Sequence, residues 1–156
     1  MSNSISTDRF LCFSLSAEKF AIPLLQVKEV VALQKITPLP QSPNYIKGII
    51  NLRGQVISIV DLGLKLKNAA LNADEKKTII ILDFASIFIG VIVDSVDSVA
   101  DFNQETISAV QEIAASVKNE YLTGVAARKG DMVLLIDLKK VFGIKEELIE
   151  RANMVA

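Results

Sequence analysis

YIKGIINLRGQVISIVDLGLKL (residues 45–66) aligns without a gap on YLTGVAARKGDMVLLIDLKKVF (121–142) when the chain is shifted by 76 positions. A shift of 69 aligns residues 9–31 with residues 78–100 in the same way. The two copies share a Tyr, two Gly and an Asp-Leu pair, namely Tyr45/Tyr121, Gly48/Gly124, Gly54/Gly130 and Asp61-Leu62/Asp137-Leu138. We therefore predict two similar β subdomains, at approximately 9–66 and 78–142.

Each copy also predicts its own turns. Gly54 and Gly130 separate two apolar runs, where a hairpin turn favours a residue that can adopt positive φ. Gly48 and Gly124 lie inside apolar runs and indicate a bulge or a sharp corner in a small barrel. Two halves of this size bury too little surface to be stable alone, so we expect one shared core.

The connecting segments are predicted from proline content and periodicity. Residues 33–42 contain two prolines and can form neither a helix interior nor a central strand. Residues 103–120 lack proline, and their apolar residues recur at helical spacing, so we predict a helix over 103–117. Residues 144–156 are predicted to form an amphipathic C-terminal helix. Residues 1–8 are expected to be a flexible N-terminus without the features of a signal peptide.

Composition excludes several classes of protein. The 156 residues are 51% hydrophobic and 22% charged, which excludes global disorder. The net charge of −1, without a basic stripe, argues against nucleic acid as a partner. The chain has no His and one Cys, so Ser-His-Asp and Cys-His sites and His-ligated zinc are excluded. Cys12 lies in an apolar run and is interpreted as a small buried hydrophobe.

One apolar stretch, Thr78–Val93, is long enough to raise the question of a membrane span. It is shorter than the ~20 residues that a spanning helix needs, and Asp83 lies near its centre. Its β-branched residues favour strands, so we predict two buried strands around a turn at Asp83–Ser86. We expect a soluble, cytoplasmic protein.

The carboxylates favour structural roles over catalysis or metal binding. Asp61 and Asp137 each follow a strand and precede a helical turn, where a carboxylate caps free N–H groups. Asp94, Asp97 and Asp101 lack the spacing of a calcium loop and are interpreted as a charged strand edge. Gly48 and Gly54 are not followed by the Lys and Ser or Thr of a phosphate-binding loop. We therefore expect no metal, no cofactor and no catalytic residues.

Arg53 is the polar residue that these structural roles leave unexplained. It lies in the predicted turn Asn51-Leu52-Arg53-Gly54. A solvated turn residue is one interpretation. The other is an interface residue, because the guanidinium combines a bidentate fork with a stacking plane.

NLRG (51–54), followed by an apolar strand and Asp61-Leu62, resembles the signature of the CheW family of bacterial chemotaxis coupling proteins. The resemblance extends over residues 9–143. Further matching motifs are FAI (20–22), QVxEV (26–30), ITxLP (36–40), PxYIKG (43–48), GV (90–91), VDxV (93–96) and EYLTG (120–124). It implies a mainly β chain of two SH3-like five-stranded barrels. It also implies a non-enzymatic adaptor that couples the cytoplasmic tips of chemoreceptors to the histidine kinase CheA, and so regulates kinase activity in membrane-associated arrays.

The resemblance also implies site residues. Val27, Glu29 and Arg53 would line a receptor-facing groove between the barrels, together with apolar neighbours such as Ile22 and Leu24. Gly48 is associated in the family with coupling to kinase and receptor.

A second surface is implied at Ser108–Ile113, which corresponds to a family contact between adaptor and kinase. There this sequence departs from the family pattern, because Ser108 and Ile113 replace an Arg and a Phe and the prolines are absent. The kinase's own C-terminal CheW-like domain would be the partner of a barrel end.

Three other functions remain open at the level of sequence. The chain could couple receptors to a kinase in a parallel pathway, such as twitching motility. It could instead be a β-barrel sensory domain that binds a ligand. An enzyme is the weakest reading and would have to rest on Asp61, Asp94, Asp137 or Lys47.

Overall fold

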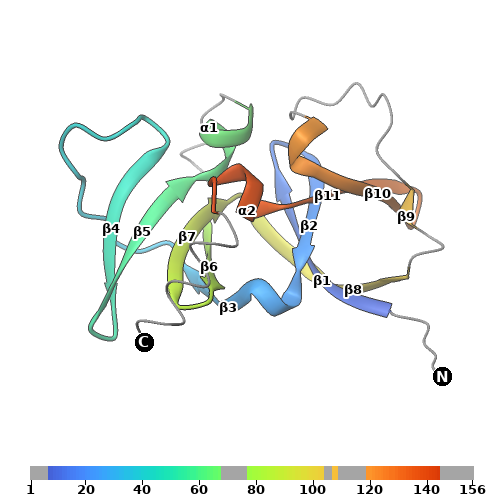
Figure 1. The fold of residues 1–156 in the computed structure, drawn as a ribbon, viewed down its shortest axis with the longest axis horizontal. Coiled ribbons are helices and arrows are strands. Elements are labelled where there is room, and N and C mark those ends of the chain that lie inside the picture. The colour runs from blue at the N-terminus through green and yellow to red at the C-terminus, as the bar shows by residue number, and fades with distance from the viewer. Residues whose placement is uncertain (1–6, 68–76, 104–106, 109–118, 145–156) are drawn as a thin grey trace.

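The computed structural model describes residues 7–67, 77–103, 107–108 and 119–144 (Figure 1). Its strands are β1 (Thr7–Leu15), β2 (Glu18–Pro23), β3 (Val27–Ala32), β4 (Ile46–Leu52), β5 (Gln55–Asp61), β6 (Thr78–Phe84), β7 (Ile87–Val93), β8 (Ser95–Asn103), β9 (Ile107–Ser108), β10 (Leu122–Arg128) and β11 (Asp131–Ile136). Its helices are α1 (Leu62–Lys67) and α2 (Leu138–Val141), with single 3-10 turns η1 (Leu24–Gln26) and η2 (Asn119–Tyr121). Strand β1 begins two residues before the expected boundary at Arg9.

The strands form two sheets that lie side by side, with α1 and α2 near the junction between them (Figure 1). We call the sheet with strand order β8-β1-β2-β11-β10-β9 barrel A, and the sheet with order β3-β6-β7-β5-β4 barrel B. Barrel A has the same five-stranded plan as barrel B, with the two-residue strand β9 added at its edge. The predicted mainly β fold of two SH3-like subdomains is confirmed.

The barrels are not the two contiguous halves of the sequence. Barrel A combines the first hairpin of the chain, β1–β2, with strands β8–β11 of the second half. Barrel B combines β3–β5 of the first half with the hairpin β6–β7 of the second. Each repeat therefore donates its opening hairpin to the other barrel, through the parallel pairs β2–β11 and β5–β7. This exchange makes the two halves fold as one unit.

The registers of the two barrels agree with the sequence repeat. In the parallel pairs, Leu135 opposes Ala21 and Ile59 opposes Gly90. Leu135 lies 76 residues after Ile59, and Gly90 lies 69 residues after Ala21, which are the two shifts of the sequence repeat. The short strand β9 also has a counterpart, because the bridge between Ser108 and Val125 corresponds to the bridge between Thr37 and Ile49.

Three apolar clusters hold the fold. The largest joins the two barrels and includes Phe13, Phe20, Ile80 and Leu82 together with Leu62 and Leu138 from the two helices. Barrel B has its own interior cluster of six isoleucines, Ile50, Ile57, Ile59, Ile79, Ile81 and Ile92. The interior of barrel A uses smaller side chains between two phenylalanines: Phe10, Cys12, Ala21, Ala100, Phe102, Ala126, Val133 and Leu135. Cys12 is buried, as predicted.

The predicted hairpin turns are confirmed. Gly54 and Gly130 have φ of +86° and +84°, and each follows a residue that also has positive φ, Arg53 or Lys129. Two central residues with positive φ give the turn twist that matches a β-hairpin. At the β6–β7 turn, the Ser86 backbone N–H donates to Asp83 Oδ1 at 2.8 Å.

The predicted bulges are confirmed at both glycines. The β4–β5 register shifts between Ile46 and Gly48, and the β10–β11 register shifts between Leu122 and Gly124. Gly48 has φ of +143°, and a Cβ placed on it would lie 2.0 Å from the Thr37 carbonyl oxygen. The proline-containing segment before it is irregular apart from the bridge to Ile49, as predicted.

The two repeated aspartates cap the helical turns that follow them. Asp61 Oδ1 accepts a hydrogen bond from the Leu64 backbone N–H at 3.1 Å, and Asp137 Oδ1 accepts one from Lys139 at 3.0 Å. The backbone N–H of each aspartate donates to the carbonyl of the repeated tyrosine, Tyr45 or Tyr121. This geometry confirms the capping prediction and gives both carboxylates a structural role.

The helix predicted over 103–117 is wrong where the structure describes it. Residue 103 ends β8, and residues 107 and 108 form β9, which pairs with β10. Apolar spacing alone misled the prediction, because the backbone of this segment finds hydrogen-bond partners on the edge of barrel A. Residues 109–117 lie outside the described residues, as does the stretch 145–156 of the predicted C-terminal helix.

The apolar stretch Thr78–Val93 forms the two predicted strands, β6 and β7. In the parts of the chain that the structure describes, no helix is both long and apolar enough to span a membrane.

Candidate functional site

The structure brings Arg53 and Glu29 together from a hairpin turn and a separate strand of barrel B. Arg53 lies at the tip of the β4–β5 hairpin, and its Nη2 donates to Glu29 Oε2 on β3. The Arg53 side chain is 65% exposed, whereas that of Glu29 is 26% exposed. The carboxylate therefore orients the guanidinium and leaves most of its donors facing solvent.

The neighbours of this pair add a second cation and an aromatic ring. Lys28 Nζ lies 4.2 Å from the centroid of the Phe88 ring and 3.5 Å from Gln55 Oε1. Exposed cation–π contacts of this kind contribute roughly 0.5–1 kcal/mol. The end of barrel B thus presents two positive groups, each held by a contact from another strand.

Val27 does not share the face of Glu29. The β3–β6 register shifts between these residues, so that Val27 opposes Leu82 and Glu29 opposes Ile81. Leu82 belongs to the core between the barrels, and Ile81 to the interior of barrel B. The bulge at Lys28 turns Val27 toward the shared core, against which it packs, and away from the Arg53–Glu29 pair.

A cavity of about 360 Å³ lies between the two barrels, and we call it the inter-barrel cavity. It is lined by the connection from barrel A to barrel B, by the β6–β7 turn and by α2: Pro23, Leu25, Gln26, Asp83, Phe84, Ala85 and Lys139. Figure 1 places η1 low between the barrels, near the edge toward which the β4–β5 hairpin also points. The residues that line the cavity include neither Arg53 nor Glu29.

Leu25 and Gln26, which line the inter-barrel cavity, are placed unfavourably for their side-chain types. The apolar residue Leu25 is 99% exposed. The other repeat carries a charged residue, Asp94, at the equivalent position. The Gln26 Oε1 atom is buried without a hydrogen-bond partner. A buried acceptor without a partner costs about 1–3 kcal/mol, so this site would gain from a donor supplied by a bound molecule.

The structure reassigns the apolar neighbours expected for the groove. Ile22 is completely buried in the core between the barrels and cannot contact a partner. Leu24 is partly buried and packs against the same core. Leu25, which sequence reasoning missed, is the exposed member of the Leu24-Leu25 doublet. The signal was the doublet itself, because adjacent residues of a helical turn point in different directions.

The remaining predicted site residues lie elsewhere. Gly48 is on β4 and faces the Thr37 backbone, away from the inter-barrel cavity. The backbone of Ser108 belongs to β9 and pairs with Val125. Ile113 lies outside the described residues.

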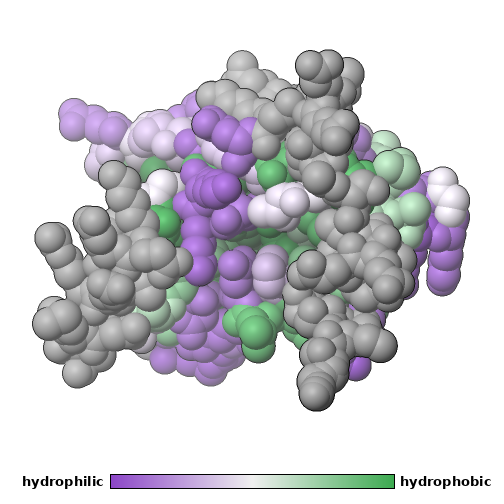
Figure 2. All heavy atoms as spheres, turned by 45° about the vertical axis from the view of Figure 1, so that its right-hand side comes forward, coloured by the Kyte–Doolittle hydropathy of each residue, from purple (hydrophilic) through white to green (hydrophobic). Residues whose placement is uncertain are grey.

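Exposed apolar side chains occur at equivalent positions of the two barrels. Val30 on β3 corresponds to Val99 on β8, and Val56 on β5 corresponds to Met132 on β11. The face in Figure 2 is largely hydrophilic where it is described, and its green apolar patches are separated. Scattered apolar residues of this kind are ordinary on protein surfaces.

The acidic residues at the β8 edge are neutralised by cations. Asp94 pairs with Lys77 at 2.7 Å, Asp97 with Lys19 at 3.3 Å and Asp101 with Arg9 at 3.3 Å. Among the described residues, no group of three or more His, Cys, Asp or Glu side chains is arranged to hold a metal ion.

Comparison with known proteins connects this architecture to one family. The model of the CheW-like domain matches residues 9–146. Chemotaxis protein CheW of Klebsiella aerogenes is 34% identical over 137 residues, which cover 88% of this chain and 82% of that protein. Chemotaxis protein CheW of Rhizobium meliloti is 30% identical over 136 residues, covering 87% and 88%. The crystal structure of the scaffolding protein TtCheW from Thermoanaerobacter tengcongensis superposes with a TM-score of 0.79 at 27% identity, covering 91% of this chain and 92% of that one.

Proposed function

The chain belongs to the CheW-like domain family of chemotaxis adaptor and scaffold proteins, and on that premise we propose that it couples chemoreceptors to the chemotaxis histidine kinase CheA. It does so as a non-enzymatic adaptor in the cytoplasm, recruited to receptor arrays at the membrane. The observation that carries the proposal is the Arg53–Glu29 pair on barrel B, together with Leu25, which is exposed at the inter-barrel cavity.

The receptor-binding side follows from the chemistry of these residues. A helical hairpin presents an apolar stripe flanked by polar side chains, and such a stripe fits an apolar groove with a charged rim. Leu25 and the wall around Phe84 would supply the apolar contact, and Arg53 on barrel B would supply a charged contact. Because Glu29 already holds the guanidinium, binding a receptor carboxylate costs little additional side-chain entropy.

The kinase-binding side rests on the pseudo-symmetry of the fold. A kinase domain with the same two-barrel plan could place one barrel end against a barrel end of this chain. The ends of barrels A and B are alike in backbone but differ in charge, since Lys28 corresponds to Asp97 and Gln55 to Asp131. This difference would let the two ends select different partners.

Charge reversal at Arg53 tests the receptor-binding proposal. We expect Arg53→Glu to weaken binding of a receptor cytoplasmic-tip fragment by about 2 kcal/mol, roughly thirtyfold, as for an interface hot spot. Isothermal titration calorimetry measures the affinity, and the melting temperature checks that the fold survives.

Lys129→Glu is the matched control, because Lys129 occupies the same turn position in barrel A, with φ of 51° against 53°. It should leave receptor affinity within about threefold, less than the ~1 kcal/mol that marks a significant contact. Equal losses in the two variants would show that net charge, and not the Arg53 site, governs binding. Unchanged affinity in Arg53→Glu would remove Arg53 from the interface.

A further inference from the structure

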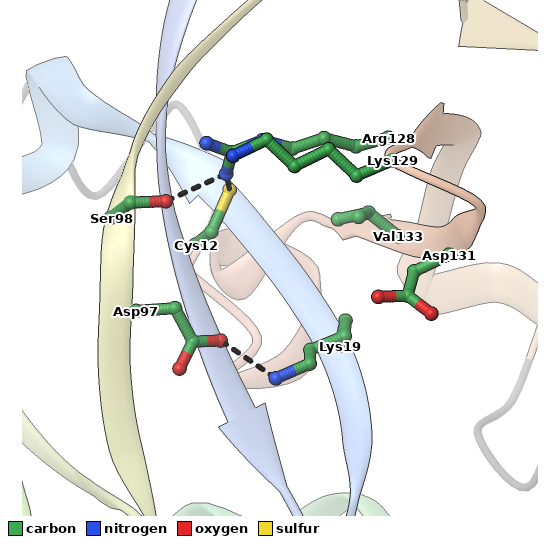
Figure 3. A pocket seen from close by; sticks show the side chains of 8 residues that line it. All are labelled: Cys12, Lys19, Asp97, Ser98, Arg128, Lys129, Asp131 and Val133. Atoms are coloured by element: carbon green, nitrogen blue, oxygen red, sulfur yellow. Dashed lines mark hydrogen bonds and ion pairs between the residues drawn. The ribbon is translucent and has the colours of Figure 1, made fainter.

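A second cavity opens at the end of barrel A, with a volume of about 300 Å³ (Figure 3). We call it the barrel A pocket. Its lining comes from β1, β2, β8 and the β10–β11 hairpin: Cys12, Lys19, Asp97, Ser98, Arg128, Lys129, Asp131 and Val133. The volume is at the lower limit of the range typical of small-molecule sites.

Three residues of the barrel A pocket replace apolar side chains of barrel B. At two of the lining positions barrel B carries an aliphatic side chain instead, since Ile81 corresponds to Cys12 and Leu52 to Arg128. Phe88, the counterpart of Lys19, lies under the Lys28 ammonium. At these three positions the shared backbone frame therefore carries apolar side chains in barrel B, and a thiol, a guanidinium and an ammonium in barrel A.

Arg128 is a half-buried cation that pairs with no carboxylate among the residues that the structure describes. Its Nη1 donates to Ser98 Oγ at 2.6 Å and lies 3.6 Å from Cys12 Sγ. A guanidinium carries five N–H donors, so a neutral hydroxyl and a thiol leave most of its hydrogen-bonding capacity unused. An anion bound by its remaining fork would be held bidentately.

Asp131 is the carboxylate that could have neutralised Arg128 but does not. The two residues face each other across the hairpin, in register. Arg128 instead extends across to β1 and β8, while the Asp131 carboxylate points into the open space of the pocket (Figure 3). The pocket therefore holds a guanidinium and a carboxylate that share a wall without pairing with each other.

The pocket also contains an ion pair and an apolar surface. Lys19 and Asp97 are already paired at 3.3 Å, so they neutralise each other. Val133 and the Cys12 thiol supply an apolar surface between the charged groups. Burial raises the pKa of the Cys12 thiol, in spite of the Arg128 charge beside it, which keeps this surface uncharged at neutral pH.

We propose that the barrel A pocket binds a small free α-amino acid, with the ligand carboxylate on Arg128, the ammonium on Asp131 and a short side chain against Cys12 and Val133. A zwitterion satisfies Arg128 and Asp131 at once, and its carboxylate also suits the Lys129 ammonium in the same lining. A phosphate would satisfy Arg128 and Lys129 but would meet the carboxylates of Asp97 and Asp131, and a simple amine would leave both cations without an anion. The site lies on the opposite barrel from Arg53, so it stands or falls independently of receptor binding.

Titration of the intact chain followed by ¹H–¹⁵N NMR tests this proposal with four probes: L-alanine, acetate, methylammonium and inorganic phosphate. We expect saturable shifts with L-alanine, centred on amides of β8 and the β10–β11 turn. Acetate and methylammonium, which each carry one of the two charges, should bind at least about tenfold more weakly, equivalent to the loss of one charged hydrogen-bonded contact.

Variants separate the two ends of the ligand. Arg128→Gln should weaken L-alanine binding by at least about tenfold, and Asp131→Asn should abolish the preference for L-alanine over acetate. Arg53→Gln is the matched control in barrel B and should leave L-alanine affinity unchanged. The amide spectrum of each variant reports whether the fold is retained.

Three results would overturn the proposal. One is the absence of saturable shifts with L-alanine up to about 50 mM, beyond which an affinity carries little free energy. Another is tighter binding of phosphate than of L-alanine, which would make the pocket an anion site. The third is unchanged L-alanine affinity in a folded Arg128→Gln variant.

Discussion

Replacing Gly48 with alanine adds a single atom, the Cβ, at a position where the neighbouring atoms are known. A Cβ at this position would lie 2.0 Å from the Thr37 carbonyl oxygen and 2.9 Å from Ile36 Cγ2. The clashing oxygen is fixed, because Thr37 and Ile49 exchange two backbone hydrogen bonds of 2.9 Å each. The segment before β4 must therefore move away, and the bridge to β4 must break.

The expected cost has two parts. A non-glycine residue held at φ of +143° costs about 1–3 kcal/mol of backbone strain. Losing the two hydrogen bonds of the bridge costs about 0.5–1.5 kcal/mol each. We therefore expect Gly48→Ala to lower the free energy of unfolding by roughly 2–6 kcal/mol. For a chain of this length the melting temperature would fall by about 5–20 °C.

Gly54→Ala is the control for this prediction. Gly54 also has positive φ, but a Cβ there would meet nothing within 4 Å. Only the conformational cost of about 1–2 kcal/mol then applies. Urea unfolding followed by circular dichroism gives both free energies. A Gly48→Ala loss no larger than that of Gly54→Ala would refute the argument that the Thr37 contact requires glycine.

Three further predictions follow from single contacts. Asp61→Ala and Asp137→Ala each remove a helix cap and should each lower stability by about 0.5–2 kcal/mol in urea unfolding, whereas an unchanged value would contradict the capping role. Lys77→Met leaves Asp94 without its 2.7 Å partner, so the single variant should unfold at lower urea than the double variant Lys77→Met/Asp94→Leu, and the reverse order would be inconsistent with a buried ion pair. The pKa of Cys12 is raised above the thiol's ordinary value of 9.0, so the folded state disfavours the thiolate. Stability from this group is complete below pH 9 and is lost as the pH rises through the folded value; stability titrations should show this fall in the native chain, and an identical fall in Cys12→Ala would disprove it.

Local structure was predictable because it depends on neighbouring residues. A glycine between two apolar runs determines a hairpin, and an aspartate between strand and helix determines a cap. Gly54 and Asp61 therefore could be assigned from sequence, and the repeat allowed the same assignments in the second half.

The exchange of hairpins was not predictable in this way. The sequence pattern allows each opening hairpin to pair with strands of its own half or with the equivalent strands of the other half. Their apolar patterns are alike, since the repeat makes β2 and β7 similar. The parallel pairs β2–β11 and β7–β5 determine which barrel each hairpin joins. The β2–β11 pair joins residues far apart in the chain, which local sequence patterns do not reveal.

The site was predictable in part for the same reason. Arg53 could be singled out from the sequence because no structural role accounted for it, but its partner Glu29 was named only through the family resemblance. Their contact joins residues 24 positions apart in the chain. Val27 and Glu29 lie on different faces of β3 because of a bulge between them. The sequence has no glycine or proline there that would predict this bulge. The barrel A pocket was missed because it results from several small or charged substitutions between repeats, each unremarkable alone.

The coupling function is tested most directly by size-exclusion chromatography of this chain with the histidine kinase CheA and a receptor cytoplasmic-tip fragment. We predict a complex of all three that forms only when this chain is present, and that is lost when the kinase lacks its C-terminal CheW-like domain. Separate elution of chain and kinase at tens of micromolar, or recruitment of the receptor fragment without this chain, would contradict the assignment of this protein as the coupling adaptor.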